Sequence, residues 1–132
     1  MAAPTVGIVV VSHSSALAEG LADVAREMAG PGVPIEPAGG RADGGLGTDE
    51  ARVRDAIARA GGGGGGVVVL GDLGSSILTV RHLLELRANG HVRLADAPLV
   101  EGAVTAAVTA SAGAALDDVL AAAESARSAR KL

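Results

Sequence analysis

The sequence predicts an α/β fold, a three-layer sandwich with a central, mainly parallel sheet and helices on both faces. Two observations carry this prediction. Short apolar runs rich in valine occur at 6–11 and 67–70, as is typical of strands buried on both faces. Along the chain they alternate with segments of helical apolar spacing, the pattern of strand–helix–strand units with right-handed crossovers. With 132 residues the chain is long enough for one core, so we expect a single domain, 1–132.

The first half of the chain predicts two strands and two helices. Val6–Val11 is a buried strand, and Ser14 or Ser15 caps the helix after it, which ends at Gly30. The buried stripe of this helix is expected to comprise Leu17, Leu21, Val24, Ala25 and Met28. Val33–Pro37 contains prolines, which places it at a sheet edge. Thr48 is predicted to cap the second helix, whose apolar stripe is Val53, Ile57 and Ala60.

Six consecutive glycines, Gly61–Gly66, open the second half. A phosphate-binding P-loop would need Lys and then Ser or Thr after its glycines, and three valines follow instead. The run is therefore predicted to be a slack connection into the third strand. The remaining elements are expected to be a strand at Val67–Leu70, a helix ending at Asn89-Gly90, a strand at His91–Ala95, and helices at Leu99–Ala112 and Leu116–Ala129.

The composition excludes several classes of protein. The chain has no Cys, which rules out disulfides, thiolate chemistry and Cys-ligated metals. A net charge of −4 and the absence of Phe, Tyr and Trp argue against a nucleic-acid-binding surface. No basic N-terminal region of a signal peptide is visible, and no apolar run approaches the ~20 residues that span a bilayer. We therefore expect a cytoplasmic protein that binds neither membrane nor nucleic acid.

Two polar loops follow predicted strands, and they hold the candidate site. Ser12-His13-Ser14-Ser15 follows the first strand, and Gly71-Asp72-Leu73-Gly74-Ser75-Ser76 follows the third. Ligand sites in open α/β sheets lie beyond the carboxyl ends of the strands. If the first and third strands are neighbours, His13 and Asp72 face each other there.

This pair has a simple chemical logic. A neutral imidazole is nucleophilic through one nitrogen, and a carboxylate bound to the other ring N–H fixes the tautomer. Serines and helix N-termini nearby offer hydrogen-bond donors for a phosphoryl group. A structural role for a histidine in such a loop stays open from the pattern alone.

Four stretches together carry a resemblance to a known family. They are residues 9–20 (VVVSHSSALAEG), Gly47-Thr48-Asp49, 71–76 (GDLGSS) and 97–103 (APLVEGA). In this order they resemble the phosphotransferase subunit of phosphoenolpyruvate-dependent dihydroxyacetone kinase, from the mannose-family enzyme IIA group of the bacterial phosphotransferase system. The resemblance covers the chain from about Val6 to Ala123.

The resemblance implies a sheet of strand order 2-1-3-4 and usually a homodimer. It implies that His13 receives a phosphoryl group from the phosphocarrier protein HPr, with Asp72 as the acidic residue beside it. The group then passes to ADP on the nucleotide-binding kinase subunit, which regenerates ATP for dihydroxyacetone. This subunit itself would bind no cofactor. The chain ends at Leu132, so HPr-like and enzyme I-like domains are expected to be absent.

Other residues are weaker candidates. Support for the phosphoryl group is expected from Ser12, Ser14, Ser15, Gly74, Ser75 and Ser76. Thr48, Asp49 and Glu101 are possible pocket residues, and no metal site is expected.

Alternative functions are a mannose-type sugar-transport enzyme IIA or a non-catalytic flavodoxin-like regulatory module. A histidine phosphatase would need an Arg beside its histidine, and a serine hydrolase would need a G-x-S-x-G elbow.

Overall fold

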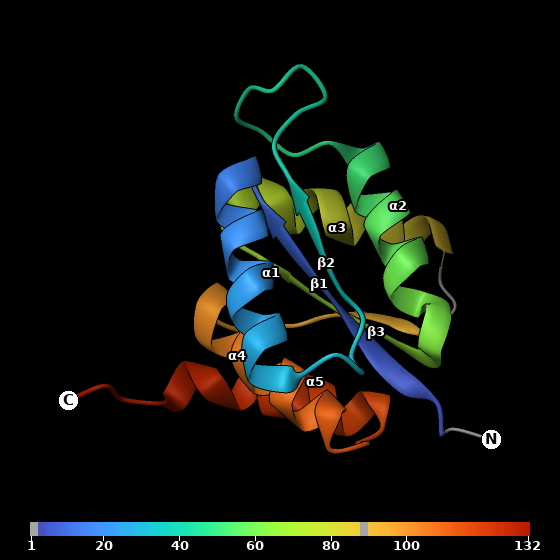
Figure 1. Ribbon diagram of the computed structural model, residues 1–132. Coiled ribbons are helices and arrows are strands. Elements are labelled where there is room, and N and C mark those ends of the chain that lie inside the picture. Colours follow the sequence, from blue (N-terminus) through green and yellow to red (C-terminus); the bar gives the residue numbers. More distant parts are fainter. Residues whose placement is uncertain (1–2, 88–89) are drawn as a thin grey trace.

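The computed structural model describes residues 3–87 and 90–132, and it shows one parallel sheet of four strands (Figure 1). The strands are β1 (Thr5–Ser12), β2 (Ile35–Gly39), β3 (Gly64–Gly71) and β4 (Val92–Leu94). The helices are α1 (Ser15–Ala29), α2 (Glu50–Ala60), α3 (Gly74–Arg87), α4 (Leu99–Ser111) and α5 (Leu116–Ser125), with short 3₁₀ turns at Gly61–Gly63 and Ala126–Ser128. The strand order is β2-β1-β3-β4, which confirms the predicted topology.

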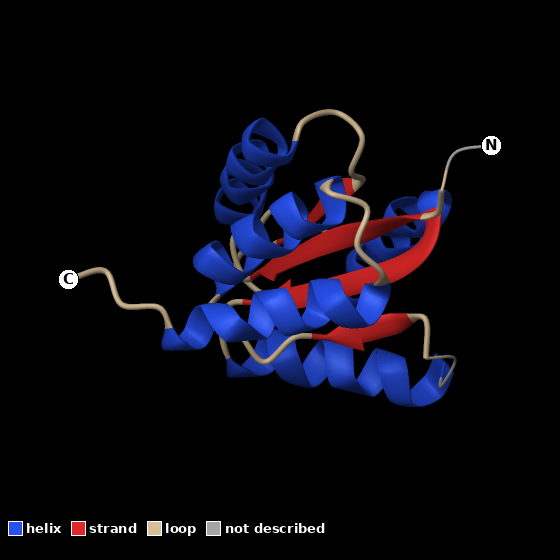
Figure 2. Cartoon of the chain, turned by 90° about the horizontal axis from the view of Figure 1, so that it is seen from below, coloured by secondary structure: helices blue, strands red, loops and turns tan. Residues whose placement is uncertain are grey.

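Helices cover both faces of the sheet, so the fold has three layers (Figure 2). The side chains of β1 alternate between the two faces: Ile8 and Val10 pack against α1, α4 and α5, while Val9 and Val11 pack against α2 and α3. Both faces of the two central strands are thus buried, which explains why their sequences read as unbroken apolar runs. Within 3–87 and 90–132, no helix combines the length and apolar character that crossing a bilayer requires.

The second strand lies at the sheet edge as predicted, but two residues further along the chain. It pairs only with β1, where Ala38 lies opposite Val11 and Gly39 opposite Ser12. Its edge position tolerates the missing N–H of Pro37. The predicted start at Val33 is wrong, because the main-chain hydrogen bonds with β1 begin with the Pro34 carbonyl, which accepts from the Ile8 amide at 2.8 Å.

The glycine run is not a slack connection, and that prediction is wrong. Gly61–Gly63 form a 3₁₀ turn and Gly64 already belongs to β3, opposite Thr5 of β1. A β-carbon on Gly65 would lie 2.6 Å from the carbonyl carbon of Thr5. Because these glycines have no side chains, the start of β3 packs directly against the backbone of β1.

The buried stripe of helix α1 matches the prediction only at Leu21 and Ala25. Its buried residues are Ala18, Leu21, Ala22 and Ala25. Leu17, Val24 and Met28 are exposed, with Met28 59% accessible to solvent, so their assignment to the core is wrong. The alanines face the sheet because their small side chains allow the helix to pack closely over β1 and β2.

Two helix boundaries also differ from the prediction. The cap of α2 is Asp49 rather than Thr48, since the Asp49 carboxylate accepts hydrogen bonds from the amides of Ala51 and Arg52. The last helix, α5, ends at Ser125 and tightens into a 3₁₀ turn. The predicted helix end at Asn89 lies outside the described residues.

Candidate active site

The candidate site lies where β1 and β3 end side by side. Val11 is in register with Gly71, so the residues that follow them leave the sheet at the same edge. The amide of Asp72 donates to the carbonyl of Val11 at 3.1 Å, which continues the strand pairing for one more residue. His13 and Asp72, 59 residues apart in sequence, are thereby brought into contact.

The Asp72 carboxylate is the centre of the hydrogen-bond network. Its Oδ2 accepts from the Ser12 hydroxyl at 2.9 Å and from the His13 amide at 3.0 Å. Its Oδ1 lies 2.9 Å from His13 Nδ1 and accepts from the Leu73 amide at 2.7 Å. Both carboxylate oxygens are therefore fixed before any ligand binds.

These contacts set the charge of Asp72. Partial burial by itself would raise the pKa of its carboxyl, but hydrogen bonds from the His13 amide, the His13 ring and the Ser12 and Ser76 hydroxyls outweigh that effect. They hold the pKa of Asp72 well below its usual range. The resulting stabilisation is complete above the ordinary carboxyl pKa, and it is lost progressively as the pH falls from there through the lowered value in the folded protein.

The ring of His13 is held in one orientation by its two neighbours. An ionised Asp72 can only accept, so Nδ1 carries the proton and donates it to Oδ1. Nε2 then has the free electron pair and contacts the hydroxyl of Ser75 in the first turn of α3. The side chain of His13 is 24% exposed, so the ring is partly accessible to solvent.

Ser76 extends this network to a third loop. Its side chain is completely buried, and its Oγ lies 3.1 Å from His13 Nδ1 and 2.8 Å from the hydroxyl of Thr48. The main chain of the same loop adds a contact, because the Gly47 amide donates to the His13 carbonyl at 2.9 Å. Thr48, which does not cap α2, thus lies in the hydrogen-bonded network around His13.

The remaining predicted residues have other surroundings. Ser14 caps α1 by accepting from the Leu17 amide at 3.2 Å, and Gly74 begins α3. Asp49 caps α2. Glu101 pairs with Lys131 at 3.0 Å, and this ammonium holds the pKa of Glu101 below its usual range. Within the described part of the chain, neither Asp49 nor Glu101 forms a hydrogen bond or ion pair with His13 or Asp72.

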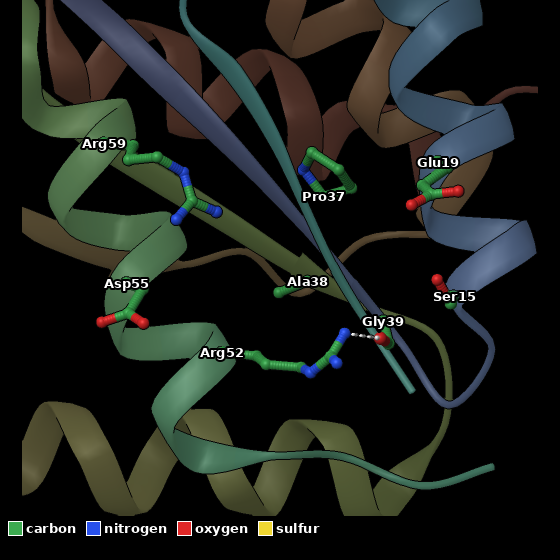
Figure 3. Close-up of a pocket in the computed structure, with 8 residues that line it drawn as sticks. All are labelled: Ser15, Glu19, Pro37, Ala38, Gly39, Arg52, Asp55 and Arg59. Atoms are coloured by element: carbon green, nitrogen blue, oxygen red, sulfur yellow. Dashed lines mark hydrogen bonds between the residues drawn. The ribbon is translucent and has the colours of Figure 1, made fainter. Parts of the chain in front are cut away.

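Ser15 lines a small cavity of about 130 Å³. Figure 3 shows the residues around this cavity, which come from α1, β2 and α2. Arg52 extends across it and donates to the Gly39 carbonyl at 3.4 Å. Arg59 is paired with Glu36 at 3.4 Å. Both guanidinium groups thus have partners within the protein, and the cavity is not the site of the His13 chemistry.

A second cavity borders Asp72, and no pattern in the sequence predicted it. Its volume is about 460 Å³, and its lining includes Asp72, Ile77 and Arg81. Arg81 is a basic residue within a helix, an ordinary position that attracts no attention in a sequence. The position of Arg81 beside the cavity is recognisable only from the structure, in which α3 starts at the site.

The arrangement is suited to nucleophilic transfer. An imidazole with one protonated and one free nitrogen, oriented by a carboxylate that is ionised at neutral pH, can take up an electrophilic group on Nε2. The carboxylate stabilises the positive charge that the ring then acquires. The N-terminus of α3, where Ser75 lies, favours an anionic group at the same place.

Comparisons with known proteins identify the family of the chain. The family model EIIA-man, described as "PTS system fructose IIA component", matches residues 7–120. The "PEP-dependent dihydroxyacetone kinase 2, phosphoryl donor subunit DhaM" of Listeria innocua is 42% identical over 106 residues, 78% of this chain and 84% of that protein. The "PEP-dependent dihydroxyacetone kinase, phosphoryl donor subunit DhaM" of Escherichia coli K12 is 40% identical over 121 residues, 87% of this chain. The chain spans only 25% of the length of that relative.

Two solved structures have the same fold. A protein of unknown function, EF1359, superposes with a TM-score of 0.83 at 33% identity, covering 96% of this chain and 97% of the other. A sigma-54 interaction domain protein from Enterococcus faecalis superposes with a TM-score of 0.67 at 18% identity, covering 93% and 90%. The latter similarity concerns the fold alone.

Proposed function

Because this chain belongs to the EIIA-man family, the fructose IIA components of the phosphotransferase system, we propose that it carries a phosphoryl group on His13 as the phosphoryl donor subunit of phosphoenolpyruvate-dependent dihydroxyacetone kinase. The observation that carries the proposal is the fixed ring of His13. Asp72 holds Nδ1, so Nε2 is left as the nucleophile. The similarity to the DhaM subunits supports the choice of kinase.

The reaction has two half-steps. In the first, the Nε2 electron pair attacks the phosphorus of a phosphorylated donor, and the bond from phosphorus to the donor atom breaks with its electrons remaining on that atom. We expect HPr to be this donor. In the second, a β-phosphate oxygen of ADP attacks the same phosphorus, and the bond to Nε2 breaks and restores the neutral ring.

The chain's own residues assist both half-steps. Phosphorylated His13 carries a positive ring with its proton on Nδ1, and the ionised Asp72 stabilises it. Ser75, which contacts Nε2 in the unphosphorylated protein, can turn its hydroxyl to donate to a phosphoryl oxygen. Ser76 contacts the ring from the buried side, and its hydroxyl is in turn bonded to that of Thr48.

The partners follow from the same proposal. The nucleotide is held by a separate kinase subunit. The phosphoryl-carrying chain described here is expected to bind no cofactor of its own. We expect the protein to act in the cytoplasm as a homodimer, and as one domain over 1–132.

A phosphotransfer assay tests the function. Incubation with labelled phosphoenolpyruvate, enzyme I and HPr is expected to add one phosphoryl group per chain, stable in base and lost in acid. Adding the nucleotide-binding kinase subunit with ADP should then discharge the label into ATP. A chain that stays unlabelled would contradict the proposal.

The family description favours one second candidate, a sugar-transport enzyme IIA. It would be phosphorylated in the same way but would discharge to a IIB domain and not to the ADP-bound subunit. Offering both acceptors to the labelled protein separates the two functions.

Replacing Asp72 with Asn is expected to slow phosphoryl uptake by about 10²-fold without abolishing it. The amide keeps the shape of the carboxyl group but loses the charge that stabilises the phosphorylated ring, and it no longer dictates the tautomer. Rapid-quench kinetics of labelling would measure the effect. Asp117→Asn is the matched control, since it removes an exposed carboxylate that is paired with Arg93 outside the network. Equal rates for wild type and Asp72→Asn would remove Asp72 from the mechanism.

A further inference from the structure

The side chains of Ser75, His13 and Asp72 form a continuous chain of hydrogen bonds. Asp72 Oδ1 lies 2.9 Å from His13 Nδ1, and His13 Nε2 contacts the hydroxyl of Ser75. Because the ionised Asp72 can only accept, Nδ1 carries the ring proton, and the Ser75 hydroxyl therefore donates to Nε2. A serine that donates to a histidine, which in turn donates to a carboxylate, is the arrangement of a Ser-His-Asp catalytic triad.

The surroundings of Ser75 suit a nucleophile. The residue is exposed in the first turn of α3. A β-carbon on the neighbouring Gly74 would meet no atom within 4 Å, so the space beside this turn is open to a reactant. The first amides of a helix have no carbonyl to bind within the helix, and here they can donate to an oxyanion that forms at Ser75.

The tertiary structure assembles this triad, and no local sequence motif announces it. His13 follows β1, whereas Asp72 and Ser75 follow β3, and the parallel pairing of the two strands brings the three side chains together. The G-x-S-x-G elbow, which the chain lacks, is the signature of one hydrolase fold. Triads on other folds are recognised by their geometry and by the roles of the three groups.

We propose that Ser75 is the nucleophile of a second activity, acyl transfer from small activated esters. Ser75 Oγ attacks the carbonyl carbon of the ester while its proton passes to His13 Nε2, and Asp72 stabilises the imidazolium that forms. The bond from that carbon to the leaving oxygen then breaks with its electrons remaining on the oxygen, and Nε2 gives up the proton. Water attacks the acyl-serine in the same way, which releases the carboxylic acid and restores the hydroxyl. The inference goes beyond the proposed function, because it needs only the unphosphorylated ring.

The test uses p-nitrophenyl acetate, whose leaving group is coloured. Stopped-flow absorbance measures the release of p-nitrophenolate by the full chain, and mass spectrometry of its peptides locates the acetyl group. Ser75→Ala removes the nucleophile and keeps His13 and Asp72, whereas Ser75→Cys restores a nucleophile at the same position. Ser111→Ala is the matched control, since it removes a hydroxyl that binds the Val108 carbonyl at the end of α4.

We expect the wild-type protein to release a burst of about one p-nitrophenolate per chain and to carry the acetyl group on Ser75. The rate of the burst should fall at least about tenfold in Ser75→Ala and in Asp72→Asn, and it should stay within about twofold of wild type in Ser111→Ala. In Ser75→Cys the burst should return, with the acetyl group on the new thiol. This recovery distinguishes a nucleophile from a residue that only supports the start of α3.

Three results would overturn the inference. They are a burst of unchanged rate in Ser75→Ala, an acetyl group on other residues with none on Ser75, and a wild-type rate no faster than that of free imidazole at the same concentration. The reaction contains neither enzyme I nor HPr, so a failure of the proposed phosphoryl transfer would leave its outcome unchanged.

Discussion

The His13→Ala variant is expected to incorporate no phosphoryl group from phosphoenolpyruvate, a loss of at least about 10³-fold in rate. The reason is chemical: Nε2 is the nitrogen that the network leaves with a free electron pair, and alanine offers no replacement. Acid-labile labelling with enzyme I and HPr, quantified per chain, measures the loss.

The same variant is expected to remain folded. It gives up the ring's hydrogen bond to Asp72, worth about 1–3 kcal/mol because the acceptor is charged, but the His13 amide still binds that carboxylate. The melting temperature should therefore fall by only several degrees.

His82→Ala is the control, since it removes an exposed histidine of α3 and should label like wild type. Label on His13→Ala equal to that on wild type would assign the phosphoryl group to another residue. Global unfolding of His13→Ala would instead give His13 a structural role.

Gly7→Ala is expected to have the largest effect on stability, a loss of about 3 kcal/mol or more. Gly7 lies in β1 opposite Val67, and a β-carbon there would be 2.0 Å from the carbonyl oxygen of Ala60 at the end of α2. That oxygen belongs to the backbone, so no rotation of a side chain can relieve the clash. Urea denaturation followed by far-ultraviolet circular dichroism measures the change.

Gly20→Ala provides the opposite case. This glycine lies within α1 with nothing within 4 Å of its would-be β-carbon, so alanine should stabilise the protein by about 0.5–1 kcal/mol. If the two variants had equal stability, close packing of α2 on β1 could not be the reason for a glycine at position 7.

The sheet and the central pair of the site were predictable from sequence because both follow from parallel strands. Val6–Val11 and Val67–Leu70 are long enough and apolar enough to be central strands, and neighbouring parallel strands end at one edge. That rule brings His13 and Asp72 together without any knowledge of the loops. Contact between Thr48 and Ser76 depends on the path of the loop after β2, for which the sequence has no periodic signal.

The errors have a common physical origin in small residues. In α1 the larger side chains, Leu17, Val24 and Met28, suggested the buried face, yet the sheet is approached by alanines. In the run Gly61–Gly66 the absence of side chains suggested a loose connection, yet it permits contact between the backbones of β3 and β1. The spacing of large apolar residues does not predict close packing through alanine and glycine. This chain has no aromatic residues, so its core relies on such close packing.

The hydrogen bond between the His13 amide and Asp72 joins positions 59 residues apart, so the site connects the two ends of the long segment between them. The geometry around His13 consequently exists only when β1 and β3 are paired. A partly folded form that keeps its helices but has separated these strands would have an ordinary imidazole on a loose loop. If His13 carries the phosphoryl group as proposed, labelling of this residue should therefore report the assembled tertiary structure.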